Sequence, residues 1–185
     1  MSRLAIYDET GNPLGEVSRD QQQIASALGE LGVRFERWQT RSLPQDADPQ
    51  AVLDAYADEV ASLNEEYGFQ SVDVVALRAD HPQKAEMRQK FLAEHIHADF
   101  EVRFFVEGSG LFYLHVGNRV YLVLCEQGDL ISVPAHTTHW FDMGKDPDFK
   151  CIRLFVIPDG WVGEFTGNPI TQHFPDYDQF VAQSA

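Results

Sequence analysis

From Glu94 onward the chain reads as a series of short apolar segments separated by turn residues. The segments are VRFFV, LFYLHV, RVYLVLC, LISVP and CIRLFVI, and the turn residues are Gly108-Ser109-Gly110, Gly117-Asn118, Gly128-Asp129 and Asp146-Pro147. Gly117-Asn118 between two alternating segments is typical of a tight hairpin. Closely spaced strands with regular turns indicate an antiparallel sandwich or barrel. The expected fold is therefore mainly β.

The region before Glu94 mixes helices with short strands. We expect one helix capped by Ser18 and stopped by Gly32, and a second that begins at Asp48-Pro49 and ends before Gly68. The other expected elements are strands over residues 33–38 and 71–77, a short helix over residues 85–92 and a short C-terminal helix around Asp176, Tyr177 and Phe180.

Composition argues against several kinds of partner. The 185 residues include 29 Asp and Glu against 14 Lys and Arg, a formal net charge of −15. Such a surface repels phosphate, so we expect no nucleic-acid partner and no anionic membrane. The start lacks an apolar signal segment, and no run approaches the ~18 apolar residues of a membrane span. Cys125 and Cys151 lie in apolar segments and are expected to be buried thiols, which favours the cytoplasm, and the heavy charge favours a monomer.

The stretch HIHADFE, from His95 to Glu101, carries three potential metal ligands. Side chains at i and i+2 of a strand share a face about 6.6 Å apart, so His95 and His97 can point at one interior position. Glu101 has the same parity, but a straight strand would place it about 13 Å beyond His97. One ion can bind all three only if the backbone bends, and we expect a bulge or a corner at residues 98–100.

A second motif supplies a fourth ligand. The spacing H-x-H-x3-E-x6-G is met by His95, His97, Glu101 and Gly108, and G-x5-P-x4-H is met by Gly128, Pro134 and His139. Together they resemble the two motifs of the cupin superfamily. Its double-stranded β-helix, a small antiparallel barrel, places three His and one Glu around a divalent metal. Cupins usually carry glycine two residues after the motif proline, and this chain has His136 there, an alternative ligand to His139.

More narrowly, the chain resembles the acireductone dioxygenase family over most of its length. The resemblance is densest in EHIHADFEVRFFVEGSG and VPAHTTHWFDMG. We therefore expect one cupin-type domain over residues 1–185. In it, residues 1–93 form a flank that contributes to the barrel, residues 94–158 the metal-binding core and residues 159–185 a C-terminal segment.

Three imidazoles and one carboxylate suit Fe(II), Ni(II), Mn(II) or Co(II). A zinc ion with four protein ligands would have no open coordination position and would be structural. The resemblance implies a dioxygenase of methionine salvage that carries one Fe(II) or Ni(II) ion and cleaves the enediol acireductone with O2. With Fe(II) the products are the keto acid precursor of methionine and formate. With Ni(II) they are methylthiopropionate, carbon monoxide and formate. Another cupin dioxygenase or isomerase, or a non-enzymatic cupin that binds metal or a small ligand, remains the alternative.

A buried arginine is expected beside the ligands. Arg103 shares the parity of Glu101, and a guanidinium inside a barrel is costly unless paired, which points to an anionic partner. By resemblance it matches the family arginine that favours the substrate dianion; the alternative is a salt bridge to a structural carboxylate. Arg153 is a second candidate, for which a structural ion pair is at least as good an explanation.

The resemblance also suggests supporting residues. Glu94 would assist metal incorporation and Phe100 would relay local changes of shape, the alternatives being polar support and core packing. The aromatic residues expected to wall a pocket for the methylthio tail, or else simply to pack in the core, are Phe91, Phe105, Trp140, Phe141 and Trp161. The histidines expected to be structural or at the surface are His81, His115 and His173.

Overall fold

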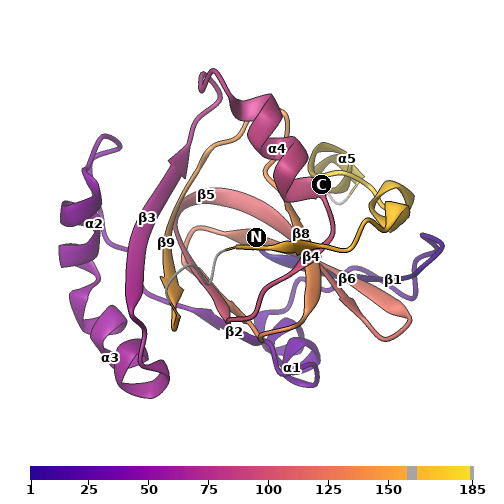
Figure 1. Ribbon diagram of the computed structural model, residues 1–185, viewed down its shortest axis with the longest axis horizontal. Helices are drawn as coiled ribbons and strands as arrows, with labels where there is room; N and C mark the ends of the chain where they lie inside the picture. The colour runs from indigo at the N-terminus through magenta and orange to yellow at the C-terminus, as the bar shows by residue number, and fades with distance from the viewer. Residues whose placement is uncertain (158–161, 184–185) are drawn as a thin grey trace.

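The structure is a computed structural model that describes residues 1–157 and 162–183 (Figure 1). Ten of its strands form one antiparallel sheet system. The strands are β1 (Arg3–Asp8), β2 (Arg34–Arg37), β3 (Ser71–Leu77), β4 (His95–Ile96), β5 (Glu101–Val116), β6 (Arg119–Glu126), β7 (Asp129–Val133), β8 (Thr138–Asp142), β9 (Phe149–Phe155) and β10 (Glu164–Phe165). The helices are α1 (Gln21–Gly29), α2 (Pro49–Ala55), α3 (Ala57–Tyr67), α4 (Lys84–Leu92), α5 (Tyr177–Gln183) and the short 3-10 helix Pro169–His173.

Strand β5 belongs to both layers of the barrel. Its first half pairs with β7 and β9, and its second half pairs with β6 and β8. The strands of the first 93 residues extend both layers, since β1 pairs with β6, β2 with β7 and β3 with β9. This mainly β, barrel-like arrangement is the cupin fold that the motifs predicted.

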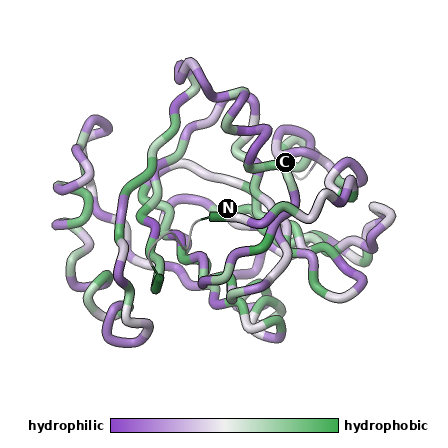
Figure 2. The backbone as a smooth tube through the Cα atoms, viewed as in Figure 1, coloured by the Kyte–Doolittle hydropathy of each residue, from purple (hydrophilic) through white to green (hydrophobic). Residues whose placement is uncertain are grey.

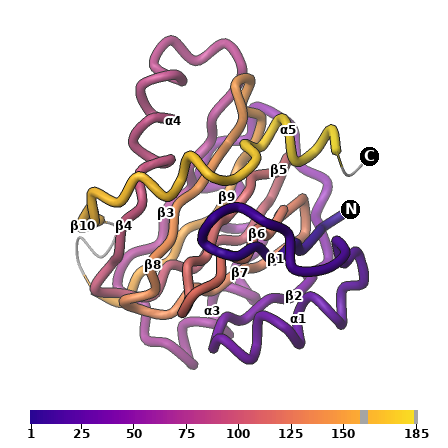
Figure 3. Tube along the Cα trace, turned by 90° about the vertical axis from the view of Figure 1, so that its right-hand side faces the viewer, coloured from indigo at the N-terminus to yellow at the C-terminus, as the bar shows by residue number. Residues whose placement is uncertain are grey.

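The helices lie around the outside of the barrel. Figure 1 shows α2 and α3 beyond β3, α1 near β2, and α4 above β9 and β8. The side view in Figure 3 shows residues 162–183 running along one side of the molecule, from β10 beside β4 to α5. Of the helices in the described residues, none is long and apolar enough to span a membrane.

The expected break at Gly108-Ser109-Gly110 is wrong, because β5 continues through it. The residues bend the strand instead. The register with β9 shifts between Phe105 and Glu107, and Gly108 has a φ of +69°. A Cβ at Gly108 would lie 1.7 Å from the Asp148 carbonyl oxygen, so only glycine fits where the two backbones approach this closely. Because of this bend, the first half of β5 lies in the layer of β7 and β9, and the second half lies in the layer of β6 and β8.

Two details of the helical flank also differ from expectation. The cap of α1 is Asp20, whose carboxylate accepts a hydrogen bond from the Gln23 backbone N–H, and Ser18 lies outside the helix. The second helix is broken into α2 and α3 at Tyr56, whose buried ring packs edge-on against Phe104 at 4.8 Å. The tight hairpin at Gly117-Asn118 is confirmed, as are the short helices α4 and α5.

Apolar side chains fill the space between the layers. Figure 2 shows hydrophobic residues following the strands, whereas the connecting loops are largely hydrophilic. Cys125 and Cys151 are fully buried in this core, as expected. Burial raises the pKa of both thiols, that of Cys151 to about 12, so they remain protonated packing groups.

Candidate metal centre

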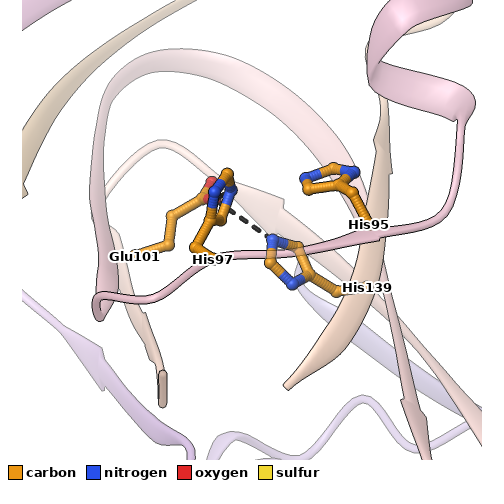
Figure 4. Close-up of side chains that lie close together, drawn as sticks. All are labelled: His95, His97, Glu101 and His139. Atoms are coloured by element: carbon orange, nitrogen blue, oxygen red, sulfur yellow. Dashed lines mark hydrogen bonds and ion pairs between the residues drawn. The ribbon is translucent and has the colours of Figure 1, made fainter. Parts of the chain in front are cut away.

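Four buried side chains from three strand regions meet at one end of the barrel interior (Figure 4). His95 lies in β4 and His97 directly follows it, Glu101 begins β5, and His139 lies in β8 opposite His95. One ligand atom of each lies within 4.8 Å of the others. The fold therefore brings together the four residues that the two motifs named, and it leaves the alternative His136 exposed and outside the cluster.

The cluster forms because the chain turns between β4 and β5. The backbone bends at Ala98 and Asp99, which confirms the predicted corner. Instead of lying about 13 Å away along a straight strand, the Glu101 carboxylate lies 2.9 Å from His97 Nε2. The bend thus converts residues four apart into neighbours.

Two backbone carbonyls determine how the imidazoles present their nitrogens. His95 Nδ1 lies 2.7 Å from the Ala93 carbonyl, and His139 Nδ1 lies 2.7 Å from the Thr137 carbonyl. A carbonyl only accepts, so each Nδ1 carries the proton, and each Nε2 is left with a lone pair. His139 Nε2 then faces Glu101 Oε2 at 3.1 Å, one electron-pair donor against another. A cation between such groups removes the repulsion, so these residues fit a bound metal ion.

The pKa values of His95 and Glu101 favour the same state, a neutral imidazole beside a carboxylate. Burial, followed by the neighbouring His139, lowers the pKa of His95 to about 4, so it is neutral at pH 7. Burial would raise the pKa of Glu101, but the charge of Arg103 holds it well below the ordinary value, so it is a carboxylate. For His97 burial lowers the pKa, but the hydrogen bond and charge of Glu101 outweigh burial and raise it. Three imidazoles and one carboxylate are a ligand set suited to Fe(II) and Ni(II).

Arg103 is buried beside this cluster. Its Nε lies 2.6 Å from Glu101 Oε1, and its guanidinium carbon lies 4.8 Å from the Phe141 ring centre and 5.3 Å from that of Phe112. The approach to Glu101 is an ion pair without hydrogen-bond geometry, and neither atom has another hydrogen-bond partner among the described residues. The salt bridge expected as the alternative is therefore present, but its carboxylate is one of the proposed ligands.

A cavity of about 290 Å³ opens onto the cluster. Besides the four residues of the cluster and Arg103, its lining comprises Lys90, Phe91, Phe141, Arg153, Phe155, Val162, Gly163 and Phe165. Arg153 also makes a two-pronged ion pair with Asp73, at 2.9 and 2.7 Å, which is the structural partner that the sequence left open.

Two expected wall residues lie elsewhere. Trp140 follows His139 in β8, so it points to the opposite face of the strand, where it stacks on Tyr113 at 4.9 Å. Phe105 lies farther along β5, fully buried in the core near Phe149. Trp161 lies outside the described residues.

Comparison with known proteins gives a consistent result. The family model described as "ARD/ARD' family" matches residues 3–163. The chain belongs to this family. It is 54% identical over 186 residues to the acireductone dioxygenase of Methylococcus capsulatus, covering 100% of both chains, and 51% identical over 182 residues to that of Aquifex aeolicus, covering 98% and 99%. A solved acireductone dioxygenase from Bacillus anthracis, with a cadmium ion in its active centre, is 29% identical with a TM-score of 0.79 over 89% of this chain and 98% of that one.

In this ARD/ARD' chain Glu94 and Phe100 lie outside the cluster of four. The buried Glu94 carboxylate accepts a hydrogen bond from Thr166 Oγ1 at 2.6 Å and pairs with His115 Nδ1 at 2.9 Å. Phe100 packs edge-on against Tyr67 at 5.6 Å. Sequence reasoning left His115 as a structural or surface residue and gave no role to Thr166; only the three-dimensional arrangement connects them to the residue preceding His95.

Proposed function

We propose that this chain is an acireductone dioxygenase whose single Fe(II) or Ni(II) ion is held by His95, His97, Glu101 and His139. It cleaves acireductone with O2, giving the keto acid precursor of methionine and formate in the iron form. In the nickel form it gives methylthiopropionate, carbon monoxide and formate. One observation carries this proposal: three imidazoles and one carboxylate converge within 4.8 Å at a cavity in a chain of the ARD/ARD' family.

The metal, when bound, supplies Lewis acidity and coordination positions for an oxygen-chelating substrate. The protein prepares its ligands in advance. The Ala93 and Thr137 carbonyls hold the protons of His95 and His139 on Nδ1, which directs both Nε2 lone pairs into the cluster. Glu101 contributes the negative charge that favours a divalent ion.

Arg103 is proposed as the residue that holds the substrate in its deprotonated form. Its Nε–H is not used in a hydrogen bond among the described residues, although Glu101 lies beside it. A fixed, buried cation stabilises an enediolate oxygen more strongly than water would, because no reorganisation is needed when the anion arrives. The rings of Phe112 and Phe141 contact the guanidinium and restrict its position.

The apolar side of the cavity is proposed to take the methylthio tail. Phe91, Phe141 and Phe155 line it together, and the rings of Phe91 and Phe141 meet edge-on at 6.1 Å. An apolar wall excludes water from the reacting enediolate, and it favours the binding of a thioether over that of a charged substituent.

Oxygen uptake on metal-loaded protein tests the proposal. The Fe(II) and Ni(II) forms should consume O2 with acireductone and yield the two different product sets, whereas a His97→Ala variant should do neither. A substrate panel separates the alternative of another cupin dioxygenase. Protein that binds the metal but consumes no O2 with any enediol would instead be a non-enzymatic metal-binding cupin.

We also propose a cytoplasmic monomer built as a single domain, without nucleic-acid or membrane partners. The net charge of −15 supports the exclusion of anionic partners. Light scattering coupled to gel filtration would test the monomer.

A further inference from the structure

Asp99 lies at the bend between His97 and Glu101, and it is only 5% exposed. Its parity along the chain matches that of both ligands, yet it is outside the group of four. Carboxylates are almost never this buried unless they are paired. The partners of Asp99 must therefore explain why the chain keeps a negative charge inside the bend.

Three backbone N–H groups bind the Asp99 carboxylate. Oδ1 accepts a hydrogen bond from Phe100 at 2.7 Å, and Oδ2 accepts from Val156 at 2.6 Å and from Ile157 at 2.8 Å. Hydrogen bonds to an ionised acceptor are about twice as strong as neutral ones. The carboxylate thus binds its own bend through Oδ1 and a second segment of the chain through Oδ2.

The second segment is the continuation of β9. Phe155 is the last residue of β9 and pairs with Ser71 of β3, so the N–H groups of Val156 and Ile157 lie just past the sheet. Backbone N–H groups that leave a sheet lose their strand partner, and Asp99 accepts from both of these. Because β9 also carries Arg153 and Phe155, the same carboxylate connects the ligand-bearing bend to one wall of the cavity.

We propose that Asp99 is a positioning residue for the metal centre: by binding the Val156 and Ile157 amides it holds the bend that aims His97 and Glu101 at one point. The inference rests on the proposed metal site, but it concerns a residue that does not touch the metal. Without this link the stretch from Ala98 to Phe100 has fewer restraints, and Glu101 is free to move away from His97. Residues that orient metal ligands typically change affinity by about 10- to 100-fold when replaced.

The test compares Asp99→Asn and Asp99→Glu. Asn has the shape of Asp but presents an amide N–H to the backbone donors, whereas Glu is larger but keeps the carboxylate. If Asp99 positions the ligands through its charge, affinity for Co(II) or Ni(II) measured by titration calorimetry falls about tenfold or more in Asp99→Asn and less in Asp99→Glu. A role in packing alone gives the opposite order, because Glu is the larger change of volume.

Two further readouts do not depend on turnover. The visible spectrum of the Co(II) form should change in Asp99→Asn, and hydrogen exchange at Val156 and Ile157 should accelerate. Asp129→Asn is the control, because Asp129 is also buried and accepts a backbone hydrogen bond, from Glu126, besides its ion pair with Arg37, but does not line the cavity. It should lower the melting temperature while leaving the Co(II) spectrum and the affinity unchanged.

Wild-type affinity and spectrum in Asp99→Asn, with binding abolished in His97→Ala, would overturn the inference while leaving the metal site intact. Retained binding in His97→Ala would instead contradict the proposed function itself. Should Asp99→Asn fail to fold, Asp99→Ser, which keeps one short acceptor, replaces it in the comparison with Asp99→Glu, with the same expected order.

Discussion

Strand β8 carries two buried polar residues, Asp142 and His139, three residues apart. The first has hydrogen-bond partners for its polar atoms, and the second faces another electron-pair donor. Asp142 is fully buried and accepts four N–H donors: two from Arg88 at 2.7 and 2.8 Å, and the backbones of Gly144 and Tyr177 at 3.0 and 2.8 Å. His139 at the other end faces Glu101, and Glu101 Oε1 has no hydrogen bond among the described residues. Satisfied buried groups stabilise a fold, whereas groups left facing one another without protons indicate a missing ligand.

The strongest way to break this comparison is to remove a ligand. His139→Ala should lower kcat/KM by about 10³-fold or more, because one of four ligands and its fixed orientation are lost. Added Ni(II) should raise the melting temperature of the wild type but not of the variant, since ligand binding stabilises only the native state. Differential scanning fluorimetry with and without metal, alongside oxygen uptake, checks both. A variant with normal metal-dependent stabilisation would place the site elsewhere.

Breaking the Arg88–Asp142 cluster should have the reverse effect, a loss of stability with metal binding retained. Arg88→Met leaves the Asp142 carboxylate buried without its cation and should cost about 3 kcal/mol or more in the free energy of unfolding. Its metal affinity, measured in the folded fraction, should stay within about twofold of the wild type, because the two clusters share no partner. Urea unfolding and calorimetry measure the two quantities. Equal loss of affinity and stability would show that the clusters are not separable.

Replacing Arg103 should separate substrate binding from metal binding. Arg103→Met removes the cation beside Glu101 and should reduce kcat/KM by about 10²-fold, while one metal ion per chain is retained. Arg103→Lys keeps the charge but not the planar donor, and should recover only part of the activity. Steady-state kinetics and elemental analysis provide the two readouts. Loss of the metal in Arg103→Met would make the residue a support for Glu101 rather than a partner of the substrate.

Metal affinity should weaken as the pH falls. Metal binding needs neutral imidazoles, so a proton at any ligand competes with the ion. The pKa of His97 is raised, so competition begins there above its ordinary value of 6.5, whereas His95, with a pKa of about 4, becomes protonated only in acid. Affinity should thus decrease already as the pH falls towards 6.5, with uptake of protons on metal release. Calorimetry at a series of pH values would measure this decrease in metal affinity. An affinity independent of pH would contradict the prediction.

The smallest expected effect concerns His136, a non-glycine residue with a φ of +63°. Its backbone N–H donates to the His97 carbonyl at 2.8 Å, so the turn supports one residue of the proposed metal site, and its imidazole is exposed. His136→Gly should raise the free energy of unfolding by up to about 1 kcal/mol, because glycine adopts this conformation without strain. Urea unfolding measures it, and Thr137→Gly is the control that should destabilise. A clear loss of stability in His136→Gly would mean that the imidazole contributes a contact of its own.

Local pattern predicted the β-rich barrel, the shared face of His95 and His97 and the bend before Glu101, because strand parity and turn spacing are properties of short segments. The fourth member, His139, was expected from the resemblance to the cupin motifs. Local pattern could not predict that β5 continues through Gly108. The continuation depends on β9 pairing with the first half of β5 and β6 pairing with the second half. Nor could parity tell how deep a side chain lies: Phe105 shares the face of Glu101 but ends in the core.

The partners of Glu94 and Asp99 were beyond the reach of sequence for a related reason. Thr166 lies 72 residues from Glu94, and Val156 lies 57 residues from Asp99. Hydrogen bonds over such separations carry no periodic signal along the chain. The residues that support a site are therefore found only when the fold has brought their segments together.

The most direct test of the metal centre is the amount of metal bound per chain. Wild-type protein loaded with Fe(II) or Ni(II) under anaerobic conditions and freed of excess should retain one ion per chain by elemental analysis, as the one such cluster within the described residues predicts. His97→Ala, prepared identically, should retain almost none. Equal metal content in the two proteins would contradict the account, because the ion would then be bound somewhere other than among His95, His97, Glu101 and His139.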